Sequence, residues 1–313
     1  MLSLLAAIAA ASAFPALGRS GGLLHLDLLS HAGVALIFFL TGLGLSTHEL
    51  RHGLSRWRVH LLVQLCTFGL FPLLWCGLDA LLGRWLAPDL ALGFAYLCAL
   101  PSTISSSVAM TAIARGNVPA AIFNATLSSL LGIVATPALL VAMVGAGGHV
   151  SLDIGGTILS LGRLLLLPLV LGQLLRPVML KWHHRYKRYT TLIDRWVILM
   201  LVFAAFCDSV EGGLWRDHGA GLLLAGVAGA ALLLGLVLAL STWAARRIGL
   251  GAEDEIAAVF CGSKKSMASG VPMAKLLFGA HPALGVIVLP VMFYHQLQLV
   301  ACTVMAGRYA RRT

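Results

Sequence analysis

A cluster of hydroxyl side chains interrupts an otherwise apolar part of this sequence. It follows Pro101 and consists of Ser102, Thr103, Ser105, Ser106 and Ser107. Proline removes a helical hydrogen bond, and hydroxyls can bond main-chain groups in place of the helical ladder. The freed carbonyls and the hydroxyls could hold a dehydrated monovalent cation or the polar groups of a substrate, and helix N-termini at the break would favour an anion. The cluster therefore predicts an ion or substrate site, although hydroxyl residues also serve simply to let helices pack closely.

A second polar cluster occupies residues 261–266, Cys-Gly-Ser-Lys-Lys-Ser. Its candidate site residues are Cys261, Ser263, Lys264, Lys265 and Ser266. A lysine at the centre of a membrane helix costs roughly 2.5–3.5 kcal/mol on insertion scales, so lysines found there are functional candidates. We expect one of the two lysines to face a cavity and favour Lys265. It would hold an anionic substrate or supply a built-in cation, unless both lysines lie in a loop before the helix begins.

Four further polar candidates lie in apolar stretches, namely Gln64, Asn124, Ser128 and His295, the last within the segment His295-Gln-Leu-Gln298. Asn124 and Ser128 are one helical turn apart and form a polar face, so both are candidate site residues. His295 could relay protons or recognise substrate. Each of the four could instead make an ordinary hydrogen bond between helices, worth roughly 0.6–2 kcal/mol.

The composition shows what kind of chain must position these residues. Of 313 residues, 59% are hydrophobic and 11% are charged, with a mean hydropathy of +0.92. Soluble domains are about 45–50% apolar and about 25% charged. The sequence therefore predicts an all-α polytopic membrane protein in a lipid bilayer. The net charge of +10 is attributed to basic cytoplasmic loops, so no nucleic-acid partner is expected.

A membrane-spanning helix needs about 20 mainly apolar residues, and ten stretches qualify or nearly qualify. They are residues 1–17, 28–45, 60–82, 90–114, 118–144, 154–175, 192–207, 219–248, 255–278 and 282–306. The two polar clusters fall inside the fourth and ninth stretches, which are therefore expected to be broken helices. Such discontinuous helices are typical of the substrate and ion sites of secondary transporters.

The two clusters are also related by an internal repeat. A shift of 163 residues places residues 261–283 over residues 98–120, with identities such as Cys98/Cys261, Ser106/Ser269 and Pro119/Pro282. Chance is the alternative, since small residues are common here. The shift is close to half of the chain length, which indicates one membrane domain over residues 1–313 built from two repeats, about 1–147 and about 152–306.

The basic residues predict the orientation in the membrane. With ten spans, the segments on one side carry most of the Lys and Arg, including the run from Lys181 to Arg188, whereas the other side carries only Arg19, Arg84, Arg163, Arg216 and Lys275. By the positive-inside rule, both termini are expected in the cytoplasm. A repeat of five spans must then be inverted with respect to its partner, which is the architecture of inverted-repeat transporters.

Several stretches resemble the bile acid:sodium symporter superfamily, with the closest fit to its SBF-like, YfeH-type branch. They are residues 38–46, 101–108, 121–125, 260–266 and 270–275, and the similarity extends from about Phe14 to the end. The resemblance implies ten helices in two inverted repeats of five, with broken helices four and nine crossing, and transport by alternating access. It also implies a small organic anion as substrate, sodium as coupling ion, no other cofactor, and location in the bacterial inner membrane.

The resemblance carries over to only part of the family's sodium shell. Gln64 matches the glutamine of helix three, and Ser107 keeps a hydroxyl of helix four, but Cys261 and Lys264 replace the glutamate and glutamine of helix nine. Val108 and Ala125 replace an asparagine and a threonine. This pattern favours sodium-independent or proton-linked transport, while Gln64, Ser105, Ser106, Ser107, Asn124 and Ser128 could still form a shifted sodium site. His295 falls near a histidine of the family's substrate cavity.

The sequence thus predicts a secondary active transporter for an organic anion, with sodium coupling left open, and not an enzyme. Two alternatives remain at this point. One is an intramembrane serine hydrolase that uses the Ser105–Ser107 hydroxyls with His295, although the chain has no G-x-S-x-G motif. The other is a membrane sensor that keeps the transporter fold and binds its ligand without transporting it.

Overall fold

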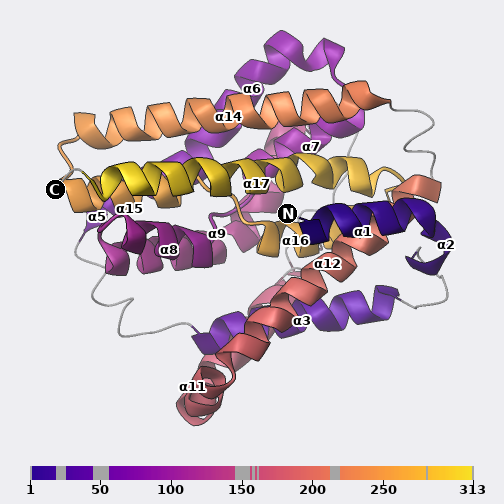
Figure 1. Ribbon diagram of the computed structural model, residues 1–313, viewed down its shortest axis with the longest axis horizontal. Coiled ribbons are helices and arrows are strands. Elements are labelled where there is room, and N and C mark those ends of the chain that lie inside the picture. Colours follow the sequence, from indigo (N-terminus) through magenta and orange to yellow (C-terminus); the bar gives the residue numbers. More distant parts are fainter. Residues whose placement is uncertain are drawn as a thin grey trace. The chain divides into compact units, whose positions relative to one another are not determined.

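The computed structural model describes residues 2–18, 26–44, 56–144, 156, 159–160, 162–211, 219–279 and 281–311. Within these ranges every regular element is a helix, and no described residue forms a strand (Figure 1). This confirms the all-helical prediction. The expected junction of the two repeats, residues 147–152, and the beginning of the span predicted at 154–175 lie outside the described residues.

The elements follow one another along the chain as α-helices with short π-helical (η1, η4) and 3₁₀ (η2) insertions. They are α1 (Leu2–Ala13), α2 (Pro15–Gly18), α3 (Leu26–Gly44), α5 (Trp57–Leu65), η1 (Cys66–Leu70), α6 (Phe71–Leu82), η2 (Gly83–Trp85), α7 (Pro88–Ala99), α8 (Ser105–Ile113), α9 (Val118–Val144), η4 (Gly162–Leu166), α11 (Leu167–Arg185), α12 (Lys187–Glu211), α14 (Ala220–Arg247), α15 (Ala252–Gly262), α16 (Met267–Phe278) and α17 (Leu284–Tyr309).

Most predicted spans coincide with these helices, and α9 has the predicted bounds. The basic run was expected to connect two spans that end at 175 and resume at 192. It is helical instead, because α11 continues to Arg185 and α12 begins at Lys187. Lysine and arginine are good helix formers, so a membrane helix can extend into water through them.

Among the described residues, five helical stretches are long and apolar enough to cross a membrane, namely Trp57–Trp85, Val118–Val144, Gly162–His183, Ala220–Arg247 and Leu284–Tyr309. Shorter apolar helices lie at Ala32–Gly44, Pro88–Ala99 and Trp196–Asp208. The chain is therefore a polytopic membrane protein. The number of ten spans and the inverted repeat remain predictions.

Both expected helix breaks are present. The predicted fourth span consists of α7 and α8, separated by non-helical residues from Leu100 to Ile104. The predicted ninth span consists of α15 and α16, separated at residues 263–266. These halves have 9 to 12 residues each, too few to cross about 30 Å of hydrocarbon alone.

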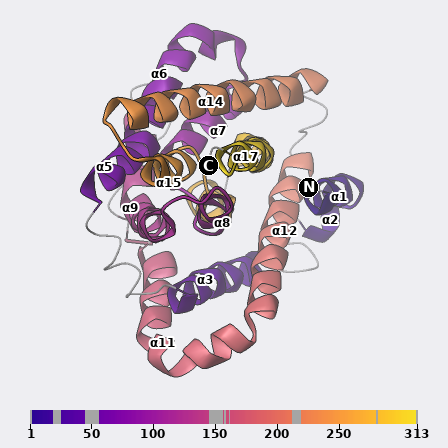
Figure 2. The ribbon, with the colours of Figure 1, turned by 60° about the vertical axis from the view of Figure 1, so that its left-hand side comes forward.

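The chain divides into two compact units. The first comprises Met1–Leu45, Leu152–Gly219 and Val271–Val288, and the second comprises Ser46–Ser151, Ala220–Gly270 and Leu289–Thr313. In the first unit, α3 packs against α11, and α12 packs against α1, α2 and α3 (Figure 2). Glycines bring α3 and α11 close together, since a Cβ at Gly42 would collide with the Leu169 carbonyl and one at Gly172 with the Phe39 carbonyl.

In the second unit, α15 lies at the centre. Its residues 254–262 are all buried, and it packs against α5, α8, α9 and α14. Small residues such as Ala120, Ala121 and Ala257 form this contact with Val59 and Val63 of α5, so the helix backbones approach closely. This packing fixes the end of α15, where the second break begins.

Candidate functional site

The two helix breaks lie against each other within the second unit. The Ser266 N–H donates to the Pro101 carbonyl at 2.9 Å, and the Ser102 hydroxyl donates to the Cys261 carbonyl at 2.6 Å. A break leaves main-chain groups without helical partners, and in an apolar interior these groups must bond elsewhere. Each break therefore provides hydrogen-bond partners for main-chain groups of the other break, and the two polar clusters of the sequence form one site.

The Lys265 side chain is completely enclosed at this site. Its Nζ donates to the main-chain oxygens of Thr67 at 2.8 Å, Cys98 at 2.8 Å and Leu100 at 2.6 Å. It also lies 4.0 Å from the centre of the Phe71 ring, where the π electrons attract a cation. An ammonium group has three N–H donors, so all three have an acceptor here.

The three carbonyls are available because the helices are irregular at those positions. Thr67 belongs to the π-helical turn η1, in which the i→i+5 pattern leaves a carbonyl without its usual partner. Cys98 and Leu100 lie at the C-terminal end of α7, where the last carbonyls lack intrahelical donors. A π turn and a helix break thus create a cage of oxygens of the kind that coordinates small cations.

Side chains from α17 fix the second break on its other side. The Lys265 N–H donates to Gln298 Oε1 at 2.8 Å, and Gln298 Nε2 donates to the Lys265 carbonyl at 2.9 Å. His295 Nδ1 lies 3.0 Å from the same Gln298 nitrogen. The Tyr294 hydroxyl donates to the Ser263 carbonyl at 2.7 Å. His295 therefore belongs to this network, one side chain away from Lys265.

Lys264 is equally buried but has fewer bonds. Its Nζ donates to the Ser106 carbonyl at 2.8 Å and lies 5.5 Å from the centre of the Phe260 ring. Among the described residues this is its one hydrogen-bond acceptor, which leaves two ammonium donors. Ser106 is in the first turn of α8, whose N-cap residue Ile104 provides no side-chain cap. The ammonium group and the positive end of a helix thus lie together.

The predicted polar face of α9 is also part of the second unit. Gln64 Nε2 lies 3.4 Å from both Asn124 Oδ1 and the Asn124 carbonyl, and Asn124 Nδ2 donates to the Ala120 carbonyl at 2.9 Å. Gln64 Oε1 is buried, and no described residue donates to it. Ser128 Oγ accepts the Ser102 N–H at 2.9 Å, which ties α9 to the first break.

The remaining candidates divide into buried and exposed residues. The Ser107 hydroxyl donates to the Phe260 carbonyl at 3.2 Å, and Ser266 Oγ accepts the Ser269 N–H at 3.1 Å and so caps α16. Cys261 Sγ donates to the Ala121 carbonyl at 3.6 Å. Thr103 accepts a 3.3 Å bond from the Ser106 hydroxyl. Ser105 is exposed on α8, and its hydroxyl makes no hydrogen bond with a described residue.

A sodium ion does not fit the Lys265 cage, because the ammonium group already takes the three oxygens that would coordinate it. In the predicted alternative shell, the hydroxyls of Ser106, Ser107 and Ser128 take part in the bonds described above, whereas Gln64 Oε1 has no donor among the described residues; a sodium site at Gln64, Ser105–Ser107, Asn124 and Ser128 stays a prediction. Among the described residues, no cluster of three His, Cys, Asp or Glu side chains forms a metal site.

Sequence reasoning missed two tyrosines that hold the site together. The Tyr294 hydroxyl donates to the Ser263 carbonyl in the second break, and the Tyr96 hydroxyl donates to the Gly270 carbonyl in α16 at 2.6 Å. Both side chains are fully buried. Buried tyrosine hydroxyls usually have a hydrogen-bond partner, so tyrosines in apolar helices were the available signal.

Discontinuous helices that meet in a bundle are typical of the sites of secondary transporters. The chain belongs to the SBF-like CPA transporter family, whose sequence pattern matches residues 1–311. It is 44% identical over 314 residues to an uncharacterized protein of Pseudomonas aeruginosa, with 99% of this chain and 92% of that one covered. It is 42% identical over 320 residues to the putative symporter YfeH of Escherichia coli, covering 100% and 92% of the two chains.

A vertebrate relative is similar over the same length. Sodium/bile acid cotransporter 7 of Mus musculus is 32% identical over 308 residues, which cover 97% of this chain and 90% of that one. These relatives confirm the predicted symporter superfamily. The family and these relatives are transporters and not enzymes, which argues against the serine hydrolase alternative.

Proposed function

We propose that this protein is a secondary active transporter for a small organic anion, in which a fixed lysine replaces a coupling sodium ion. The observation that carries the proposal is the pair of buried ammonium groups at the meeting of the two breaks. Among the described residues, neither Lys264 nor Lys265 has an acidic partner. An uncompensated buried charge is costly, so a site with two of them favours an anionic ligand.

The two lysines have different roles in this proposal. Lys265 has three carbonyl acceptors, so it acts as a tethered cation that holds α5–α6, α7 and the second break together. Lys264 has one acceptor and two further donors next to the N-terminal end of α8, and it binds the substrate anion. This assignment differs from the sequence-based preference for Lys265, because a lysine with all donors satisfied has none to offer a substrate.

The driving force follows from the same geometry. With the cation built into the chain, transport needs no sodium gradient and uses protons or exchange of anions instead. His295, which contacts the Gln298 bridge to Lys265, is the candidate proton carrier. The account retains the predicted ten spans, two inverted repeats, alternating access and cytoplasmic termini in the bacterial inner membrane.

Uptake into proteoliposomes tests this proposal. Purified protein would be reconstituted and given labelled organic anions, including cholate because a relative is named as a bile acid cotransporter, under sodium, potassium and pH gradients. We expect uptake of at least one anion without sodium, and its loss in Lys264→Gln. Lys181→Gln, which removes an equal charge from an exposed position on α11, should transport normally.

Two results would contradict the proposal. Uptake that requires sodium would show that a sodium site exists elsewhere in the chain. Specific binding of an anion without any uptake, measured as a rise in thermal stability, would identify the protein as a sensor.

A further inference from the structure

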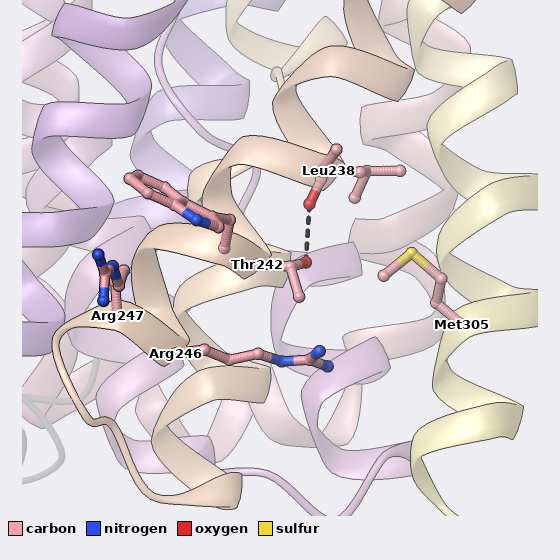
Figure 3. Close-up of a pocket in the computed structure, with 7 residues that line it drawn as sticks. Leu238, Thr242, Arg246, Arg247 and Met305 are labelled. Carbon is pink, nitrogen blue, oxygen red and sulfur yellow. Dashed lines mark hydrogen bonds between the residues drawn. The ribbon is translucent and has the colours of Figure 1, made fainter.

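A surface cavity of about 540 Å³ lies in the second unit, away from the lysine site. It is lined by Leu238, Ala239, Thr242, Trp243, Arg246 and Arg247 of α14 and by Met305 of α17 (Figure 3). The α14 residues form two rows spaced by four positions, so both rows lie on one face of the helix. Each row begins with an apolar residue and ends with an arginine.

The cavity lies where two candidate membrane spans end. Arg246 and Arg247 are the last residues of α14, and Tyr309 is the last residue of α17. Both ends meet at Glu255, which accepts bonds from Arg246 Nε and Nη2 at 3.1 Å and from the Tyr309 hydroxyl at 2.9 Å. Since α14 and α17 are candidate membrane spans, we expect the arginines at a membrane surface and the apolar part of the cavity along the bilayer-facing part of α14.

The two arginines have donors to offer an anion. Arg247 has no ion-pair or hydrogen-bond partner in the described part of the chain, whereas Arg246 is paired with Glu255, also interacts with Tyr309, and keeps fewer donors. Figure 3 shows Arg246 extending from α14 toward α17, while Arg247 lies at the opposite edge of the cavity. Guanidinium groups bind phosphate oxygens through paired N–H donors.

The apolar walls specify what else the ligand must contain. Leu238, Ala239 and Met305 offer no charge, and Trp243, which is 62% exposed, has the amphipathic ring that membrane proteins place at the level of lipid headgroups. The C-terminal end of a helix repels an anion, so the arginine side chains and not the α14 backbone must provide the attraction.

We propose that this cavity binds one anionic phospholipid, with the phosphodiester at Arg247 and an acyl chain along Leu238, Ala239 and Met305. Charge complementarity selects an anionic over a zwitterionic headgroup, and the position at the end of two spans selects a lipid over a soluble phosphate. Basic pockets between membrane helices bind anionic headgroups in this manner. This inference is independent of the transport proposal.

Native mass spectrometry of the purified full-length protein tests it. The protein would receive equal amounts of phosphatidylglycerol and phosphatidylcholine with identical acyl chains. We expect phosphatidylglycerol to be retained preferentially, and Arg247→Gln to weaken its binding about fivefold, since a basic residue near the surface contributes on the order of 1 kcal/mol. Ala239→Trp should reduce the binding of both lipids by filling the apolar part. All of these positions are exposed, so the variants should fold.

A control separates this site from the general attraction of a basic protein. Arg84→Gln removes an equal charge that also lies beside a tryptophan, with its guanidinium 4.0 Å from the centre of the Trp85 ring, but outside the cavity. It should leave the preference for phosphatidylglycerol unchanged. The proposal is overturned if Arg84→Gln and Arg247→Gln act equally or if the two lipids bind equally. A dimer that Ala239→Trp dissociates would also overturn it, because a second copy would then cover this face.

Discussion

Replacing each of the two buried lysines by methionine should destabilise the protein to very different extents. Methionine has a similar length and no charge, so either substitution removes an ammonium group and leaves its acceptors behind. Lys265→Met leaves the main-chain oxygens of Thr67, Cys98 and Leu100 without their donor, whereas Lys264→Met leaves only that of Ser106.

The difference in the free energy of unfolding between the two variants follows from the number of carbonyls that lose their donor. A buried polar group that loses its partner lowers the free energy of unfolding by roughly 1–3 kcal/mol. The two additional carbonyls should therefore make Lys265→Met less stable than Lys264→Met by about 2–6 kcal/mol. Removing a charge from the interior is favourable in both variants, and this contribution largely cancels in the comparison. The closer Phe71 ring adds up to about 1 kcal/mol to the difference.

The assay is reversible unfolding of both variants and the wild type in mixed micelles with increasing denaturing detergent. The free energy of unfolding should decrease in the order wild type, Lys264→Met, Lys265→Met. Lys265→Gln, which restores two N–H donors, should fall between wild type and Lys265→Met. Equal losses for the two methionine variants, or a larger loss for Lys264→Met, would refute the assignment of Lys265 as the cation that holds the helices together.

Two further predictions concern other buried bonds. Tyr294→Phe should lower the free energy of unfolding by about 1–3 kcal/mol, because the Ser263 carbonyl loses its donor. The control Tyr186→Phe, at a partly exposed position, should change it by less than about 0.5 kcal/mol. Similar losses in the two variants would contradict the role of Tyr294. In the first unit, Lys275 Nζ lies 3.5 Å from Asp208 Oδ2, with side chains 10% and 17% exposed. Lys275→Met should lower the free energy of unfolding by about 3 kcal/mol, and adding Asp208→Asn should restore part of this loss. If the double variant loses as much stability as the two single variants together, the pair does not interact.

The sequence was sufficient to predict the broken helices and much of the composition of the site. Pro101 and the hydroxyls after it mark the first break, because proline removes a helical hydrogen bond, and the 163-residue repeat matches the lysine-bearing segment 261–266 to that break. The helix bounds followed from apolar length, with errors where α11 and α12 continue through charged residues.

The oxygen cage around Lys265 could not be predicted, for a physical reason. Its acceptors are main-chain carbonyls, which every residue has, and they are available only because η1 is π-helical and α7 ends at Ala99. Pro101 marks the end of α7, but no side-chain pattern indicates that η1 is π-helical, so the meeting of their carbonyls was not visible in the sequence. The Lys275–Asp208 pair was missed because its members are 67 positions apart, on two helices whose mutual packing the sequence does not reveal.

The most direct test of the fixed-cation account is the thermal stability of wild type and Lys265→Ala in sodium chloride and in choline chloride. A ligand that binds only the folded state stabilises it by mass action, by about 2.7 kcal/mol at 100 times its dissociation constant. The account predicts equal stability of the wild type in both salts, and sodium-specific stabilisation of Lys265→Ala, in which the carbonyl cage is vacated. Sodium-specific stabilisation of the wild type would contradict it, because the coupling ion would then bind beside the lysine instead of being replaced by it.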